Sequence, residues 1–449
     1  SRGRVGLTSG CPPAPPAPRP PAPPAPPAPP PPATTLRANT LFALLGSTVN
    51  GVFYWSLFSL CLRVLDAAAA GHLALGLSIT SPLMILAQLG LRQHYVVRMT
   101  TPYNFRDYAV LRGITTMLAL LMSVGIAQAF YAPSTVILVG TVGLMKVAEN
   151  GSDLTYAVHQ KHNRLDTIAS SIIARCVMGL IAMVAGLWFF ESPAPAILGV
   201  AASWALVLIA FDMRTVIPEH DARPKTTIKD LLSATDQKPT KERRLTLASE
   251  SAPLAFAMVI ASLIANVPRL YIEHTLGATS LGHFAAVAYF VVPGAMFMSA
   301  LGQAYMPELA SALSARNASK FNQKLTMLLV SASVLGVCGL ALSVLAPETL
   351  LWLAYGTTDT ALSDNLLFVM IIALLTNVAA ALSCALTSAK CFSVQLKLQL
   401  CTLALISCSV APFVKTFGVR GALAAWLLGV SFQCLAMAMT LKKQLLATV

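Results

Sequence analysis

Charged residues are scarce in this sequence. Asp, Glu, Lys and Arg make up only 11% of its 449 residues, whereas hydrophobic residues make up 56%. A soluble globular chain is roughly one-quarter charged, so there is too little polar material here to cover a surface that faces water. Apolar runs recur along the whole length, each near the ~20 residues that a helix needs to cross a bilayer. We therefore predict an all-α, polytopic membrane protein.

Signatures of catalysis and of cofactor binding are also missing. Gly71 and Gly76 have the spacing of a phosphate-binding loop. They are followed by Leu77 and Ser78, where such a loop requires Lys and then Ser or Thr. The nine cysteines form no C-x-x-C pattern and fall mostly inside apolar runs, which indicates packing rather than metal ligation or disulfides. We expect no enzymatic activity, no metal and no cofactor.

The net charge of +13 raises the question of a nucleic-acid partner. Such binding requires basic residues clustered on one folded face, whereas here they lie in short loops between apolar runs. Lys and Arg concentrate in the loops of one side, which is the orientation signal of a membrane protein. Only Arg63, Arg269, Lys415 and Arg420 fall at span ends of the other side. We predict a multi-pass protein of the cytoplasmic (inner) membrane with both termini cytoplasmic, surrounded by membrane lipids and binding no nucleic acid.

Composition divides the chain into residues 1–38, 39–212, 213–248 and 249–449. The first segment is rich in Pro and Ala, and its density of prolines excludes a helix and favours solvated polyproline II, so we expect a disordered tail. The third is highly charged, so we expect a solvated cytoplasmic linker between two six-helix lobes. The predicted spans lie at about 39–62, 68–91, 107–131, 134–158, 165–190, 194–212, 249–272, 281–306, 323–346, 364–388, 396–414 and 420–441.

An internal repeat supports the division into two lobes. Leu65–Pro82 aligns with Leu276–Pro293 without a gap. The identical pairs are Leu65/Leu276, Ala67/Ala278, Gly71/Gly282, His72/His283, Ala74/Ala285 and Pro82/Pro293. Because six spans separate the copies, both face the same way, as in transporters whose halves are related by an axis along the membrane normal.

The repeat places Pro82 and Pro293 in the middle of their predicted spans. A proline inside a helix removes one hydrogen bond and favours a kink. The two prolines are therefore candidate hinges. Two inherited packing kinks without a moving role explain the pattern equally well.

Ionisable residues within a span are costly and usually face a bundle interior or a wet cavity. Lys146, Glu149 and Asp153 have a spacing that places them on one stripe of a helix, and Arg175 enters the next span from the other end. Depth estimates place Lys146 and Arg175 near the middle of the bilayer. Two interpretations stay open: the cations line a cavity that attracts a polyanion, or the carboxylates simply neutralise them in a structural cluster.

Arg269 and Glu273 lie four residues apart near the outer end of a span. An ion pair at the membrane interface is the simpler interpretation. If the outer mouth of a transport path closes at this span, the two residues form part of a gate instead.

Several short motifs follow one another along the predicted spans of residues 39–445. They are Glu149-Asn-Gly-Ser-Asp153, Gln160, Arg164, Ile168-Ala-Ser-Ser171, Arg175, Asn266-Val-Pro-Arg269-Leu-Tyr271, Leu276-Gly277, Gly282-His-Phe and Gly418-Val-Arg-Gly421-Ala. With these motifs the chain resembles the polysaccharide transporters, the flippases for lipid-linked O-antigen and capsule repeat units of the multidrug/oligosaccharidyl-lipid/polysaccharide exporter superfamily. The proline-rich tail departs from the pattern of that family.

The resemblance implies two six-helix lobes around a central cavity that opens alternately to either side. The substrate would be an undecaprenyl-diphosphate oligosaccharide, exchanged against protons or sodium. Lys146 and Arg175, with Arg269 as a third candidate, would meet the diphosphate or acidic sugars. Glu149 or Asp153, with Glu273 as a further candidate, would take the coupling ion or pair with the cations. Polysaccharide polymerase machinery would be an expected partner.

Two other functions remain as alternatives. A drug or other lipid exporter of the same fold is the first, although the midplane cations disfavour cationic drugs. A membrane glycan polymerase or ligase is the second, and it would be expected to carry catalytic residues on a long outer loop. The longest predicted outer segment, about 347–363, contains Glu348 and Asp359 but no catalytic constellation.

Overall fold

The computed structural model describes residues 33–97, 103–220, 241–357 and 359–448, and within these ranges all regular structure is helical. The tail predicted for residues 1–38 lies almost wholly outside them. The helices are α1 (Ala33–Val64), α2 (Ala67–Gln88), α3 (Leu91–Val97), α4 (Phe105–Phe130), α5 (Pro133–Lys161), α6 (Leu165–Phe190), α7 (Pro193–Val207), the π-helical turn η1 (Leu208–Asp212), α8 (Met213–His220), α10 (Lys241–Ala288), α11 (Val291–Ser314), α12 (Ala318–Leu345), α13 (Pro347–Tyr355), α14 (Thr360–Ser388), α15 (Phe392–Phe417) and α16 (Val419–Thr448).

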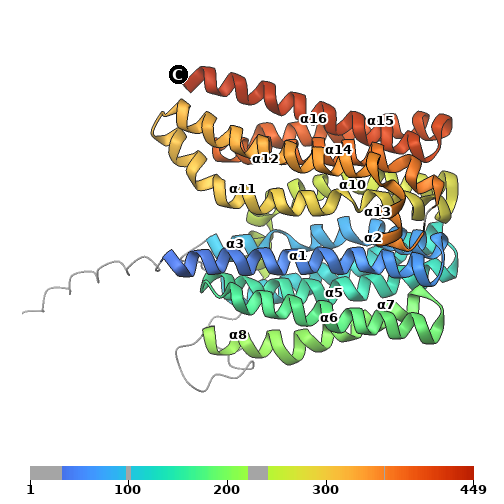
Figure 1. Ribbon diagram of the computed structural model, residues 1–449. Helices are drawn as coiled ribbons and strands as arrows, with labels where there is room; N and C mark the ends of the chain where they lie inside the picture. Colours follow the sequence, from blue (N-terminus) through green and yellow to red (C-terminus); the bar gives the residue numbers. More distant parts are fainter. Residues whose placement is uncertain (1–32, 98–102, 221–240, 358, 449) are drawn as a thin grey trace, which may run out of the picture.

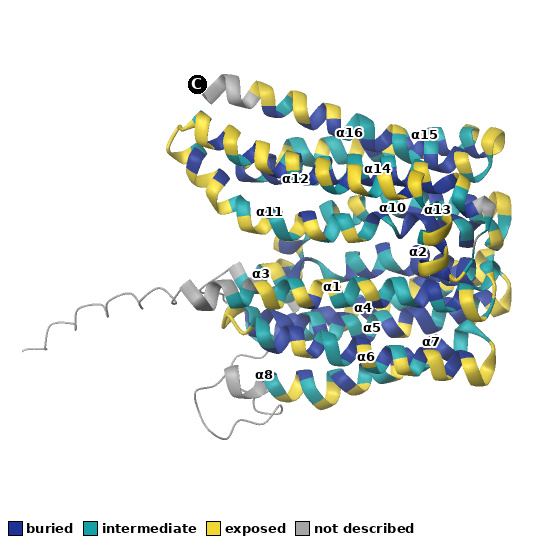
Figure 2. Cartoon of the chain, viewed as in Figure 1, coloured by how far each residue is buried: buried dark blue, intermediate teal, exposed yellow. Residues whose placement is uncertain are grey.

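The helices form two lobes that lie side by side, as predicted. Figure 1 shows α1 to α8 in one lobe and α10 to α16 in the other. The start of α1 and the end of α16 lie at the same end of the bundle, which we call the terminal end. Buried residues gather within the lobes and along their contact, while exposed residues coat the sides (Figure 2). Large apolar residues such as Leu121 and Ile181 are among the exposed ones, as expected of a surface that faces lipid.

Ten helical stretches of the described residues are long and apolar enough to cross a membrane. One of them, Glu242–Ser314, has 73 residues. At 1.5 Å per residue it would extend ~110 Å, more than three times the thickness of the hydrocarbon core. It reverses at Gly277, whose φ of 81° and ψ of 177° suit only glycine. This stretch therefore counts as two crossings. Helix α5 is absent from the ten stretches because Lys146, Glu149 and Asp153 make it less apolar. Counting α5 as well gives the twelve predicted crossings.

The two copies of the repeat cross each other at the end of the bundle opposite the chain termini. A Cβ atom added to Gly71 of α2 would overlap the carbonyl oxygen of Ala278, and one added to Gly282 of α10 would overlap the carbonyl oxygen of Ala67. The two contacts are equivalent, because adding 211 to the residue numbers 67 and 71 gives 278 and 282. The two copies of the repeat are therefore related by a pseudo-twofold axis that passes between Gly71 and Gly282. The glycines allow the two backbones to touch there.

Replacing Gly71 with Ala should force α2 and α10 apart at this crossing. Overpacking of this kind costs about 1–3 kcal/mol, so we expect a lower melting temperature in detergent. Gly125→Ala is the matched control, because a Cβ atom there meets nothing within 4 Å. It should leave the melting temperature unchanged or raise it slightly. Equal melting temperatures for the two variants would contradict the close crossing.

The predicted solvated linker, residues 213–248, is helical at both ends. It begins with α8 and ends in the first turns of α10, where Leu247 is fully buried among side chains of the first lobe such as Leu91 and Tyr108. Arg243 of this segment also lies 3.4 Å from the Asp107 carboxylate. Charge content alone therefore misplaced residues 241–248, which pack as part of a helix. Residues 221–240 lie outside the described ranges.

The two repeat prolines do not occupy equivalent backbone environments, contrary to the prediction of paired mid-span kinks. Pro82 is buried inside the continuous helix α2. Pro293 follows a break at Tyr289 and Phe290 and lies in the first turn of α11, where a missing N–H group leaves no helix hydrogen bond unmade. A hinge role for either proline remains a prediction.

Candidate transport cavity

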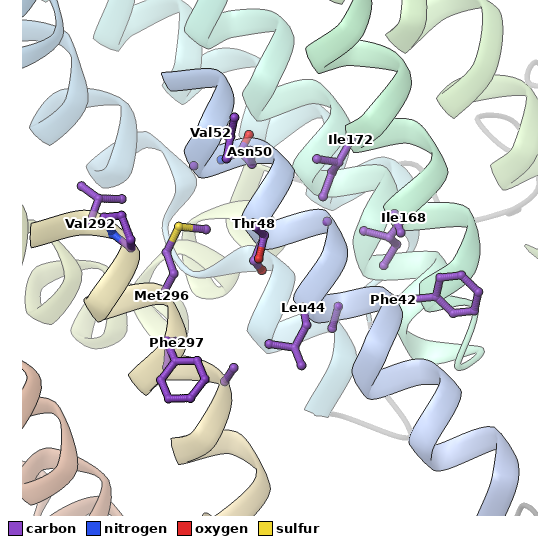
Figure 3. Close-up of a pocket in the computed structure, with 18 of the residues that line it drawn as sticks. Phe42, Leu44, Thr48, Asn50, Val52, Ile168, Ile172, Val292, Met296 and Phe297 are labelled. Carbon is purple, nitrogen blue, oxygen red and sulfur yellow. The ribbon is translucent and has the colours of Figure 1, made fainter. Parts of the chain in front are cut away.

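A cavity of about 1280 Å³ lies between the two lobes. It extends along α1 from Asn39 to Trp55, which corresponds to a depth of ~24 Å. Asn163, in the turn between α5 and α6, lies at its terminal end. Figure 3 shows side chains of α1, α6 and α11 around it.

The first lobe contributes a polar wall centred on Glu149. Lys146 Nζ lies 2.8 Å from Glu149 Oε2 and donates a hydrogen bond of 2.7 Å to Tyr54 Oη. The Tyr54 hydroxyl donates in turn to Glu149 Oε2 at 2.8 Å. On the other side Arg175 Nη2 lies 3.7 Å from Glu149 Oε1. Both predicted cations therefore pair with the same carboxylate. Among the described residues, neither forms an ion pair with another acidic side chain.

Some hydrogen-bond donors of Arg175 have no partner in the described part of the chain. Its side chain is only 4% exposed and stacks on Trp204, with the guanidinium carbon 4.3 Å from the ring centre. Nη2 donates to Asn50 Oδ1 at 3.1 Å, while Nε and Nη1 have no hydrogen-bond partner in the described part of the chain. Both atoms are buried although Arg175 lines the cavity, so a shift of the guanidinium would be needed to present them to an anionic group that enters it.

Asp153 belongs to a second cluster, which sequence reasoning missed. It pairs with Arg92 at 2.9 Å and with Arg112 at 3.0 Å, and Arg92 also donates to Gln160. Arg92 falls just outside a predicted span, where a loop is expected. Leu89 and Gly90 have positive φ values of 50° and 58°, and this break between α2 and α3 allows Arg92 to reach the cavity wall. Left-handed backbone at a leucine has no clear sequence signal.

The ionisable side chains that line the cavity are paired. Arg175 and Arg92 are its lining cations and Glu149 and Asp153 its lining carboxylates, so the charges of the lining balance. Lys146 and Arg112 pair with the same two carboxylates but do not line the cavity. The structure thus shows an internally paired cluster, and the binding of an anion to it remains a prediction.

The remaining walls of the cavity are mainly apolar. Phe42 of α1, Ile168 and Ile172 of α6, and Met296 and Phe297 of α11 line it (Figure 3). Phe42 and Phe297 are 39% and 49% exposed, so both offer apolar surface at the cavity.

The cavity is closed at the end opposite the chain termini by contacts between the lobes. Phe58 of α1 stacks on Tyr289 with ring centres 4.4 Å apart. Ser59 Oγ donates to the carbonyl oxygen of Ala354 at 2.6 Å, and Arg63 Nη2 donates to that of Leu353 at 2.6 Å. Both acceptors lie in the last turn of α13, where a cation is favourable for a helix. The short helix α13, within the outer segment predicted at 347–363, therefore acts as a cover over the cavity.

Arg269 and Glu273 do not form an ion pair among the described contacts. Glu273 lies beside Tyr131 and His72 instead. Arg269 packs against Tyr289, with its guanidinium carbon 6.0 Å from the ring centre. Neither residue lines the cavity, although both lie near its closed end. The described residues contain no group of His, Cys, Asp or Glu able to hold a metal ion.

Glu149→Gln should destabilise the protein strongly. The substitution leaves Lys146 and Arg175 without their shared carboxylate, and losing one partner of a buried ion pair costs about 3–5 kcal/mol. We expect a clear drop in the melting temperature of the purified protein. Glu191→Gln, at an exposed position, is the control and should melt like the unmodified chain. A Glu149 variant as stable as this control would show that the cations need no counter-ion.

Comparison with known proteins agrees with this architecture. The chain matches no family model. It is 24% identical over 288 residues to the capsular polysaccharide biosynthesis protein CapF of Staphylococcus aureus, a match that covers 64% of this chain and 69% of CapF. At this identity the match alone does not assign a family.

Solved structures of transporters share the fold. The lipid II flippase MurJ in an inward closed conformation superposes with a TM-score of 0.67 and 12% identity, covering 91% of this chain and 89% of MurJ. The MATE multidrug transporter DinF-BH, in complex with R6G, superposes with a TM-score of 0.65 and 13% identity over 92% and 96% of the two chains. The protein therefore has the two-lobe, all-helical fold of the MATE and MurJ transporters and is a multi-pass membrane protein.

Proposed function

We propose that this chain is a flippase that moves a lipid-linked, phosphate-bearing oligosaccharide across the cytoplasmic membrane by alternating access. The observation that carries the proposal is a cavity with two arginines, Arg92 and Arg175, on a polar wall and apolar side chains on the other walls. A lipid-linked sugar has the same division, with an anionic diphosphate next to a hydrocarbon chain. Arg175 would bind the phosphate oxygens, and Lys146 would hold Glu149 in place.

The apolar part of the cavity wall supports a lipid substrate rather than a soluble one. Phe42 and Phe297 line it and are 39% and 49% exposed. A polyprenyl chain would lie against these side chains while its headgroup meets the arginines, which avoids the cost of placing a long apolar chain in a polar space.

The direction of transport follows from the basic loops. If the terminal end faces the cytoplasm, as the Lys and Arg distribution predicts, the cavity lies on the cytoplasmic side and the cover formed by α13 lies on the outer side. Lipid-linked precursors made in the cytoplasm would then enter the cavity from the cytoplasmic side. Glu149 and Asp153 are the proposed sites for a coupling ion, and release of either from its cation partners would accompany each cycle.

Export of a drug or another lipid is the second candidate. It is favoured by the two carboxylates at the cavity, which could attract a cation, and by the occurrence of the fold in proteins described as multidrug transporters. Arg92 and Arg175 on the same wall oppose cationic substrates.

Complementation distinguishes the candidates. The full chain is produced in a strain that lacks its own oligosaccharide flippase, and surface glycan and cytoplasmic lipid-linked precursor are measured together. We expect restored glycan and loss of the accumulated precursor. Failure to restore glycan with several repeat-unit types, combined with lower accumulation of a cationic dye, would establish the drug exporter instead.

A further inference from the structure

Arg269 differs from the other cations buried near the cavity in having no counter-ion. Within the described residues no carboxylate pairs with it, and its Nε atom is buried without a hydrogen-bond partner. The face of Tyr289, 6.0 Å away, is the one compensating group that the described contacts provide. An uncompensated cation inside a membrane protein is expensive, so its retention indicates that an anion reaches it at some stage of the cycle.

The position of Arg269 along α10 places it slightly nearer the outer turn than Tyr289. It lies eight residues before the reversal at Gly277, and Tyr289 lies twelve residues after it. At 1.5 Å per residue Arg269 is ~12 Å from the outer turn and Tyr289 is ~18 Å from it. Tyr289 lines the cavity and Arg269 does not. Arg269 is therefore nearer the outer end than the barrier residue Tyr289.

The pseudo-twofold axis relates Arg269 to a residue of this barrier. Its equivalent in the first lobe, 211 residues earlier, is Phe58. Phe58 stacks on Tyr289 at 4.4 Å, while Arg269 approaches the same ring at 6.0 Å. The two pseudo-equivalent residues thus both pack on Tyr289. When the lobes separate at this end, Phe58 must leave with α1, and Tyr289 and Arg269 remain together on the other lobe.

We propose that Arg269, beside the Phe58–Tyr289 stack and outside the cavity lining, is a second anion-binding site that receives the phosphate group of the substrate when the outer end opens. The inference rests on the proposed function. The phosphate would pass from the donors of Arg175 in the first lobe to the uncompensated Arg269 in the second. Separation of the aromatic stack joins the two sites. No bond is made or broken in this transfer.

The first test compares transport with binding. For binding, the full chain is held closed by a thiol cross-link between Ser59→Cys and Ala354→Cys in a background without native cysteines, and undecaprenyl diphosphate in detergent micelles is the probe. We expect Arg269→Gln to lower glycan export at least tenfold while the locked protein binds the probe as tightly as its parent. Arg175→Gln should weaken binding in the locked state. Normal export by Arg269→Gln, or weakened binding in the locked state, would overturn the proposal.

A second variant keeps the proposal testable if Arg269→Gln fails to fold. Phe58→Ala removes half of the aromatic stack and exposes Arg269 to the cavity. The locked Phe58→Ala protein should therefore bind the probe more tightly than the locked parent, by roughly threefold or more, and adding Arg269→Lys should keep part of this gain. An unchanged affinity of the locked Phe58→Ala protein for the probe would contradict an anion-binding site at Arg269 beside the Phe58–Tyr289 stack. If the locked parent binds no probe at all, the proposed function fails rather than the placement of Arg269.

Discussion

Arg175→Ala should abolish most of the export activity, with surface glycan reduced at least tenfold and lipid-linked precursor accumulating. The Arg175 side chain lines the cavity, has two buried donors without a partner among the described residues and makes one contact to Glu149. Alanine removes the donors, and a hydrogen bond to a charged group is worth about 1.5–3 kcal/mol, or roughly ten- to a hundredfold in binding. The measurement is complementation at matched membrane levels of each variant.

Two further variants separate charge from geometry in this test. Arg175→Lys retains a positive charge but cannot grip two phosphate oxygens in a plane, so we expect its export to lie between that of Arg175→Ala and that of the parent. Arg214→Ala, at an exposed position of α8, should export normally. Normal export by Arg175→Ala would reduce the arginine to a structural partner of Glu149.

Joining α1 to α13 should stop transport almost completely. Ser59 Oγ and the Ala354 carbonyl are 2.6 Å apart across the two lobes, so cysteines at these positions can be bridged by a short cleavable thiol reagent. If the closed end must open in every cycle, the bridge blocks the cycle, and a reductant should restore it. Glycan export in cells before and after reduction is the measurement.

The single cysteine variants, treated with the same reagent, control for modification alone. They should export normally, because neither position lies at the anion-binding donors of Arg175. Undiminished export by a fully bridged double variant would mean that α13 does not move during transport.

Much of the fold was predictable because bilayer crossing imposes length and hydropathy on each helix. The twelve spans and the two-lobe division follow from that constraint and from the repeat. The cover helix α13 and the buried segment near Leu247 were not predicted, because nine-residue helices and charged helix starts resemble loops when only composition is considered. Their structure depends on contacts with distant elements.

The sequence predicted several residues of the site but not which side chains pair with one another. Spacing on one helix stripe places Glu149 beside Lys146, and the structure pairs these two side chains and adds Arg175 to the same carboxylate. The same spacing offered no means of separating Asp153, which lies one turn further and pairs with Arg92 and Arg112. Those partners come from α3 and α4, and pairing between helices leaves no periodic signal in one sequence.

The docking of Leu247 against the first lobe has a consequence for biosynthesis. The hydrophobic cluster around Tyr108 and Val216 lacks one of its buried members until residue 247 has left the ribosome, about 30 residues after α8 begins to form. At 5–20 residues per second this interval lasts roughly 2–6 s. During that time the newly made lobe exposes an apolar site, which chaperones or insertion factors could occupy. A gene split within residues 221–240 would encode a first fragment that depends on the second to complete its own core.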